Sequence, residues 1–192
     1  DVYKRQLYTM LLLVISLCTA SCSDWLDVSP SNQVNGDKLF EIGDGYRNAL
    51  NGIYLNLGTS SMYGQTMSWG FMDAIAQYYK TDNGSNFIPK TSAYYKSAKF
   101  QFEDSDVKTF ISNIWSVSYN NIANCNNLIL NVSEASPSVF KEGEFEKNMI
   151  WGEALALRAF MHFDLLRLFA PAISKDDGKS YIPYVEAVSY TH

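Results

Sequence analysis

The chain has 192 residues, a formal net charge of −5 and three cysteines. Hydrophobic residues make up 47% of it and aromatic residues 15%, which is enough apolar side chain for a packed core and too much for a disordered chain. The negative charge and the scattered lysines and arginines argue against a nucleic-acid-binding protein, because phosphate recognition needs a concentrated basic face. The length fits one domain, or one domain with a leader.

The first element is an apolar run, LYTMLLLVISLCTA, at residues 7–20. A membrane-spanning helix needs about 20 apolar residues, so this shorter run, which follows Lys4 and Arg5, predicts the core of a signal peptide. The two ends of the chain, DVYKRQ (1–6) and VSYTH (188–192), resemble translated sequencing-adapter tails. The signal-peptide prediction therefore depends on residues 7–22 only.

The apolar run ends in small residues followed by a cysteine, and LCTASC (17–22) resembles a bacterial lipobox. In that motif the thiol is alkylated by a diacylglycerol, the chain is cleaved before the cysteine, and the new N-terminus is acylated. We expect residues 1–21 to be a lipoprotein signal peptide and Cys22 to carry the lipid, since several acyl chains together give stable anchoring. The alternative is an ordinary signal peptide followed by a chance cysteine.

Residues 22–36 are rich in Ser, Asn, Asp and Pro and predict an extended tether before a helical domain at 37–192. Apolar residues then recur at spacings of three and four from Asp37 to Leu57, which predicts one helix that ends at Gly58. Gly43, Gly45 and Gly52 weaken this pattern. A second helix is expected over residues 68–80.

A long loop is expected between residues 81 and 105, with a turn at Asn83-Gly84 and with or without a short extended piece. It carries five aromatic residues: Phe87, Tyr94, Tyr95, Phe100 and Phe102. Aromatic side chains in a polar loop of this length are typical of a binding loop, but they are equally expected if the loop covers a helical core. The sequence leaves both interpretations open.

Two further helices are expected, at residues 106–132 and 145–170. The first has an apolar face that includes Ile122 and Cys125, with its asparagines on the opposite side. The second is apolar around most of its circumference and stops at Pro171, so we expect it to be buried among several neighbours. Trp115 and Trp151, 36 positions apart, come near the repeat length of stacked helical pairs. The pattern predicts an all-α fold.

No residue pattern indicates catalysis, a metal site or a cofactor. His162 lies in the most apolar helix and is best explained as a structural histidine, while Asp164 and Arg167 are three residues apart and able to pair. Cys125 is expected to be a small buried side chain, because no Cys-x-x-Cys spacing is present. We therefore predict a protein that is not an enzyme and needs neither cofactor nor metal.

Four segments together resemble the N-terminal part of the SusD/RagB family, glycan-binding outer-membrane lipoproteins of Bacteroidota. They are SCSDWLDVSPSNQV (21–34), GYRNALNGIYLNL (45–57), IWSVSYNNIANCNNLI (114–129) and GEALALRAFMHFDLLRLFAP (152–171). The last is the most specific. Members of that family are much longer, so the resemblance implies a truncated, incomplete SusD-like domain at 37–192.

The resemblance implies tetratricopeptide-like helical pairs with long loops, lipid attachment at Cys22 and exposure on the cell surface. It also implies capture of an oligosaccharide or polysaccharide and delivery to a SusC-like TonB-dependent transporter. The loop argument, and not a matched motif, suggests five glycan contacts: Trp69, Asp82, Asn86, Tyr94 and Tyr95. A lipid-anchored helical-repeat adaptor for a protein or peptide is the main alternative, and a surface hydrolase with carboxylates in a missing C-terminal half is a third.

Overall fold

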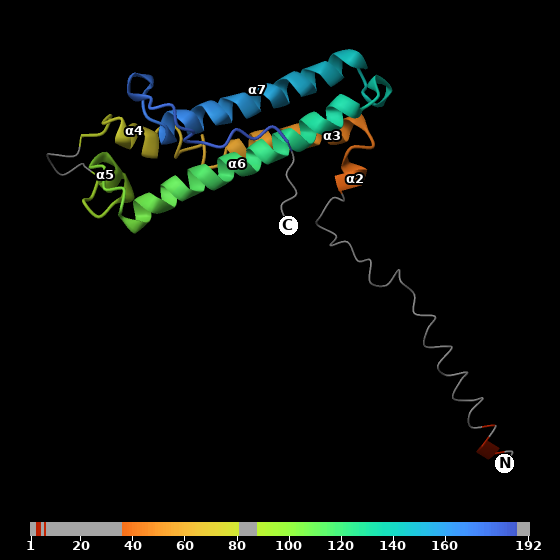
Figure 1. Ribbon diagram of the computed structural model, residues 1–192, viewed down its shortest axis with the longest axis horizontal. Coiled ribbons are helices and arrows are strands. Elements are labelled where there is room, and N and C mark those ends of the chain that lie inside the picture. The colour runs from red at the N-terminus through yellow and green to blue at the C-terminus, as the bar shows by residue number, and fades with distance from the viewer. Residues whose placement is uncertain (1–2, 5, 7–35, 81–87, 188–192) are drawn as a thin grey trace. The chain divides into compact units, whose positions relative to one another are not determined.

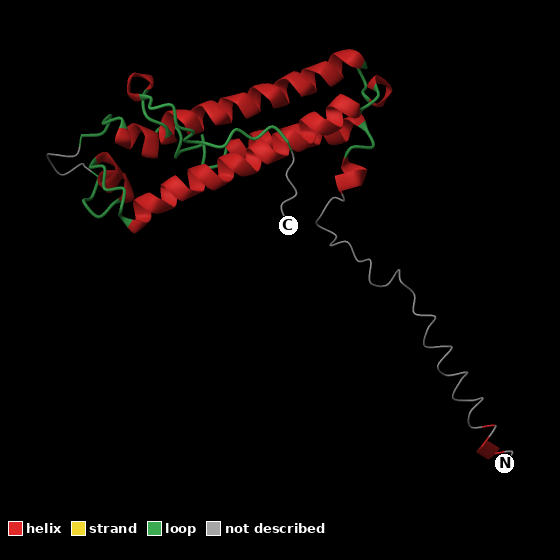
Figure 2. Cartoon of the chain, viewed as in Figure 1, coloured by secondary structure: helices red, strands yellow, loops and turns green. Residues whose placement is uncertain are grey.

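The computed structural model describes residues 3–4, 6, 36–80 and 88–187. Contacts divide the chain into two units, Asp1–Lys38 and Leu39–His192, and the features below belong to the second unit, except for the first three residues of the short helix at Gly36–Leu39. Three long helices dominate it: α3 (Gly43–Leu57), α6 (Ser105–Glu134) and α7 (Glu144–Phe169). Each contacts the other two, and α6 and α7 form an antiparallel pair (Figure 1). The described part of the chain contains helices and loops but no strand, which confirms the all-α prediction (Figure 2).

The core lies between these three helices and is made of their inward-facing apolar residues. The fully buried aliphatic side chains include Leu50 of α3, Ile114, Ile122 and Leu128 of α6, and Ile150, Met161 and Leu165 of α7. Along each helix these buried residues recur at spacings of three and four, so they form one stripe that packs against the neighbouring helices.

The single helix expected over residues 37–57 is wrong, because the chain turns between α2 (Gly36–Leu39) and α3. Ile42 is extended at the start of α3, and the amide of Gly45 donates to the Ile42 carbonyl at 2.9 Å. A Cβ atom on Gly45 would lie 1.6 Å from the carbonyl oxygen of Leu39, so only glycine permits this close turn. Gly58 caps the C-terminus of α3, as predicted.

The helix expected over residues 68–80 is much shorter, because α4 spans only Phe71–Ile75. Turns occupy the chain from Gly58 to Gly70, and Gln77 has a positive φ of 62°, which a helix cannot continue through. The following segment also differs from the prediction, since a short helix, α5 (Ala93–Ala98), forms where a loop was expected. The Ser92 side chain caps it by accepting from the Tyr94 amide at 3.3 Å.

Helix α6 confirms the prediction for residues 106–132 and begins with Asp104 as its cap, whose side chain accepts from the Asp106 amide at 3.0 Å. The placement of its asparagines was partly wrong, since Asn121 and Asn126 are buried. Asn121 donates to the carbonyl of Val117 at 3.0 Å and accepts from Asn56 at 3.1 Å. Burial is tolerated because these amides are hydrogen-bonded.

Helix α7 confirms the prediction for residues 145–170, and the chain leaves the helix before Pro171. The expectation that it is buried among several neighbours holds on one side of the helix only, because α7 contacts α3 and α6 there. Ile150, Ala154, Met161 and Leu165 face α3 and α6, but Phe163 on the opposite side is 57% exposed. Within the described residues, α7 thus has two apolar faces and only one is covered.

Candidate functional site

Helices α4 and α5 lie at one end of this unit (Figure 1), and four large aromatic residues close to them in sequence are exposed. Trp69 (56% exposed) precedes α4, Tyr78 (77%) follows it, and Phe100 (55%) and Phe102 (43%) lie between α5 and α6. We call these four residues the aromatic patch. Exposed rings present flat apolar faces to solvent, and such surfaces commonly mark a binding site.

Two residues with an unusual backbone position this patch. Gln77 and Phe100 have φ values of 62° and 55°, in the left-handed region where side chains other than glycine are strained. The Gln77 side chain donates to the carbonyl of Ala98 at 2.7 Å and so joins the end of α4 to the end of α5. Strain of this kind costs about 1–3 kcal/mol and is found preferentially at functional sites, so it supports this end of the unit as the candidate site.

Trp69, Tyr94 and Tyr95 of the predicted glycan contacts lie at this end but have different surroundings. The carbonyl of Trp69 accepts a hydrogen bond from the Tyr79 hydroxyl, and its indole faces solvent. The half-buried Tyr94 stacks on Phe110, with ring centroids 5.2 Å apart.

The Tyr94 hydroxyl accepts from Gln65 Nε2 at 2.8 Å, and burial raises the pKa of Tyr94. Tyr95 is half-buried, with the Lys99 ammonium 5.7 Å from its ring centre. Tyr94 therefore packs the site, while Trp69 is available to a ligand. Asp82, Asn86 and Cys22 lie outside the described residues, and their roles stay predictions.

An ion-paired cluster ties α5 to the start of α6 beside the patch. Lys96 Nζ lies 2.9 Å from carboxylate oxygens of both Asp104 and Asp106. Hydrogen bonds to these carboxylates raise the pKa of Lys96, and the hydrogen bond from Lys96 lowers the pKa of Asp104. Because each of these three charged groups already has a partner in the protein, we interpret the cluster as a link between the two helices.

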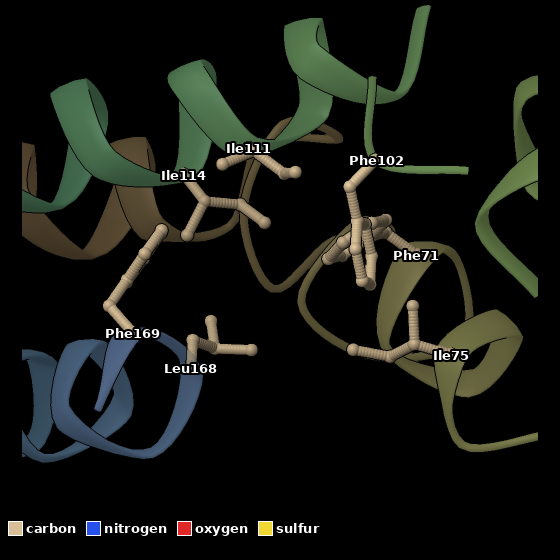
Figure 3. Close-up of a pocket in the computed structure, with 7 residues that line it drawn as sticks. All are labelled: Phe71, Ile75, Phe102, Ile111, Ile114, Leu168 and Phe169. Atoms are coloured by element: carbon tan, nitrogen blue, oxygen red, sulfur yellow. The ribbon is translucent and has the colours of Figure 1, made fainter. Parts of the chain in front are cut away.

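An apolar pocket of about 220 Å³ opens between α4, α6 and the end of α7 (Figure 3). Its seven lining residues are Phe71, Ile75, Phe102, Ile111, Ile114, Leu168 and Phe169. Phe102 thus belongs both to the aromatic patch and to this pocket. All seven side chains are hydrocarbon, so the pocket suits an apolar group and offers no side-chain partner for sugar hydroxyls.

His162 and Cys125 are committed to packing. Nδ1 of the buried His162 lies 2.9 Å from the carbonyl of Arg158, and Nε2 accepts from the Val185 amide at 3.1 Å. This pairing places the proton on Nδ1. Burial raises the pKa of the Cys125 thiol to about 12, which makes it a poor nucleophile. The sequence interpretation of both residues as structural agrees with these contacts.

The predicted pair of Asp164 and Arg167 is confirmed, with Arg167 Nε donating to Asp164 Oδ1 at 3.1 Å. Asp164 also accepts from the Tyr63 hydroxyl at 2.6 Å, and burial followed by this hydrogen bond raises the pKa of Tyr63. The carboxylate therefore fixes the loop before α4 against α7. Such a satisfied network is structural.

Sequence reasoning did not select Tyr78, Phe100 or Phe102 as site residues, although it noted both phenylalanines in the loop. Their exposure depends on the left-handed turns at Gln77 and Phe100, and neither residue type predicts such a turn. Within residues 36–80 and 88–187, no three side chains of the metal-binding types come together. None of the described helices has the length and hydropathy needed to cross a membrane.

Comparison with known proteins gives two findings. A SusD-like family model, described as starch-binding and associating with the outer membrane, matches residues 24–191. The SusD-like protein P2 of Formosa agariphila is 24% identical over 184 residues, which are 96% of this chain and 34% of that protein. The chain thus spans about a third of the length of this curated relative. No solved structure matches the chain significantly. Because the family match covers most of the chain, the protein belongs to the SusD-like family.

Proposed function

We propose that this protein is a lipid-anchored protein of the outer-membrane surface that binds an oligosaccharide or polysaccharide and passes it, uncleaved, to a TonB-dependent transporter. The family match supports the binding role and the association with the outer membrane. The aromatic patch is the observation on this chain that carries the proposal. Pyranose rings have apolar C–H faces, and burying them against an exposed ring stabilises the complex while hydroxyls remain free for polar partners.

The binding role is tested by affinity electrophoresis against a panel of starch, other α-glucans, β-glucans and algal polysaccharides. We expect at least one of them to retard the protein, and we expect the variants Trp69→Ala and Phe102→Ala to weaken retardation at least about tenfold, the equivalent of 1.4 kcal/mol. Phe145→Ala is the matched control, because Phe145 is a 68% exposed aromatic residue at the N-terminal end of α7. Equal retardation of all variants would remove the aromatic patch from the proposal.

The lipid anchor is tested at Cys22. Cells that express the protein are fed an alkyne-bearing palmitate analogue, and we expect the label on the wild-type protein and none on Cys22→Ala. Cys125→Ala is the control, since this thiol is buried and should have no part in lipidation. A label that persists on Cys22→Ala would overturn the anchor.

Delivery is tested separately from binding. In cells that depend on the retarding polysaccharide, we expect deletion of the gene to slow uptake of its labelled oligosaccharides, and we expect the tagged protein to copurify with a TonB-dependent transporter. Uptake at the wild-type rate, with binding intact, would restrict the function to capture.

A protein-binding adaptor is the second candidate, and the pocket between α4, α6 and α7 favours it. The pocket is lined entirely by hydrocarbon, as is typical of a site for an apolar side chain of a protein partner. Ile111→Glu would place a charge in it. If this variant loses a copurifying protein while polysaccharide retardation is unchanged, the pocket serves a protein partner.

A further inference from the structure

The apolar pocket between α4, α6 and the end of α7 is continuous with the aromatic patch. Phe102 lines the pocket and is also a member of the patch, with 43% of its side chain exposed. The ring of Phe100, another member, lies 5.9 Å from the ring of Phe102. Trp69 precedes the pocket residue Phe71 by two positions. A ligand that lies on the patch therefore has the opening of the pocket beside it.

A tight turn brings Phe102 to the pocket. The Phe102 amide donates to the carbonyl of Phe100 at 2.9 Å, and Phe100 itself has the left-handed backbone. The Gln77 side chain, just after α4, donates to the carbonyl of Ala98, so the α4 wall of the pocket is joined to the segment that leads to Phe102. The ring shared by patch and pocket is thus positioned by backbone contacts on both sides.

Aromatic contacts outside the pocket hold two of its walls in place. Phe71 packs on Phe110, with ring centroids 5.8 Å apart, and Phe110 in turn stacks on Tyr94. Phe169 meets Trp115 edge to face at 4.9 Å. Protein interiors pack as densely as organic crystals, so side chains that were free to move would close a space of this size. Because these rings are held by their neighbours, the pocket is preformed, as ligand sites usually are.

The size and the lining of the pocket select a single aromatic ring. Its volume is about 220 Å³, and all seven lining side chains are hydrocarbon (Figure 3). An engineered apolar cavity of about 150 Å³ in another protein stays dry and binds benzene, so this pocket has room for a benzene ring and its linking atoms. A sugar ring would lose the hydrogen bonds of its hydroxyls there. A two-carbon acetyl group would fill only a small part of the space.

Continuity with the patch favours a substituent of the glycan over a side chain of a protein partner. A specific protein interface buries about 800 Å² on each partner, much more than one ring-sized pocket provides. The exposed rings beside the pocket are those that we propose to hold sugar. A sugar that carries an aromatic group would contact Phe102 from the patch and from the pocket at once.

We propose that the pocket binds the aromatic group of an aryl-substituted glycan, in particular an aromatic acyl ester on a sugar hydroxyl, while the sugar itself lies on the aromatic patch. This inference rests on the proposed function and specifies its substrate class. The interaction is non-covalent, and its gain comes from burying the ring against hydrocarbon.

The ligand preference is tested by affinity electrophoresis with three forms of each polysaccharide in the panel: unmodified, partially acetylated, and benzoylated to the same degree. The acetylated form is the matched control for the ester group. We expect the benzoylated form of a retarding polysaccharide to bind at least about tenfold more tightly than the acetylated form, because only the benzoyl ring fills the pocket.

Two variants of Ile111 test whether the preference arises in the pocket. Ile111→Glu introduces a charge, and Ile111→Phe occupies the space with its own ring while keeping the position apolar. We expect both to bring the ratio between benzoylated and acetylated forms to about one. Leu130→Glu is the control, since it places the same charge on a 48% exposed position of the same helix and should keep the wild-type ratio. Circular dichroism checks that each variant is folded.

The pocket is also tested without sugar. Toluene is titrated into the isotope-labelled protein, and the isoleucine methyl signals are followed by nuclear magnetic resonance. We expect saturable shifts at Ile75, Ile111 and Ile114, which line the pocket, and none at Ile150, which is fully buried in the core. Unchanged signals from the three pocket isoleucines would overturn the proposal.

The outcomes separate this inference from the proposed function. If unmodified polysaccharide retards the protein and the benzoylated form binds no better than the acetylated one, the inference is wrong and glycan binding stands. A benzoyl preference that both Ile111 variants retain would likewise overturn the pocket as its source. If no form of any polysaccharide retards the protein, the proposed function fails and the inference fails with it. If all three forms bind equally and Ile111→Glu loses a copurifying protein, the pocket serves a protein partner instead.

Discussion

The three-helix bundle and the α4–α5 end of the same unit differ in helix length, in backbone strain and in the burial of their apolar side chains. In the bundle, long helices bury apolar stripes, and the buried polar groups are paired within the protein. At the α4–α5 end, two helices of five and six residues are each followed by a residue with positive φ, and large rings face water. Regular packing stabilises the folded state and exposed strained turns destabilise it, so we expect the bundle to carry the stability, while the aromatic patch is the proposed ligand contact.

The largest effect is expected from a cavity in the bundle, which tests directly whether the bundle carries the stability. Ile122 is fully buried in α6, so Ile122→Ala should lower the free energy of unfolding by about 2–5 kcal/mol, through lost apolar burial and the cavity that remains. Urea denaturation followed by circular dichroism measures the change. Leu55→Ala on the exposed side of α3 should cost about 0.5 kcal/mol or less. A loss below about 1 kcal/mol at Ile122 would contradict a bundle that carries the stability.

The buried asparagine of α6 gives an intermediate effect. Asn126 Oδ1 accepts from Arg158 Nη1 at 3.0 Å, and its Nδ2 donates to the Val185 carbonyl. Asn126→Ala removes both hydrogen bonds at a buried position and should lower the free energy of unfolding by about 1–3 kcal/mol in the same denaturation experiment.

Asn124, two residues earlier and exposed, is the matched control for Asn126, because its side chain bonds to Asn120 of the same helix at 3.3 Å. We expect Asn124→Ala to change the free energy of unfolding by about 0.5 kcal/mol or less. Indistinguishable losses at the two asparagines would mean that the Asn126 network adds nothing to the bundle.

The smallest expected effect on stability is at Phe100, and it has the opposite sign. Glycine adopts the left-handed backbone of this residue without strain, so Phe100→Gly should raise the free energy of unfolding by about 1 kcal/mol. Phe100→Ala also removes the ring but keeps the strained backbone, so it should not stabilise the protein.

Both Phe100 variants should weaken polysaccharide retardation if the ring contacts the ligand. A destabilised Phe100→Gly variant would show that the ring, and not the backbone, dominates at this turn. Stabilisation with unchanged retardation would remove Phe100 from the aromatic patch as a binding residue.

The sequence predicted the long helices well because their evidence is local. Apolar spacing and the proline at 171 are both read from residues that are neighbours in the sequence, and α6 and α7 agree with the expected ranges within two residues. The short helices were predicted poorly for the complementary reason. The early end of α4 depends on a left-handed turn at Gln77, which a hydrogen bond to the carbonyl of Ala98 supports across 21 residues.

The sequence by itself determined that the protein is all-α, that the apolar segment at residues 145–170 is one long helix, and that the chain resembles a SusD-like protein. Periodicity and local motifs are properties of neighbouring residues, so they can be recognised without knowledge of the fold. Only the tertiary structure decided that Asn121 and Asn126 are buried, that Tyr94 packs while Trp69 faces water, and that α7 keeps large apolar residues exposed among the described part of the chain. These outcomes depend on which surfaces pack together between residues far apart in the sequence. Burial of a side chain is set by that packing, so it cannot be read from neighbouring residues.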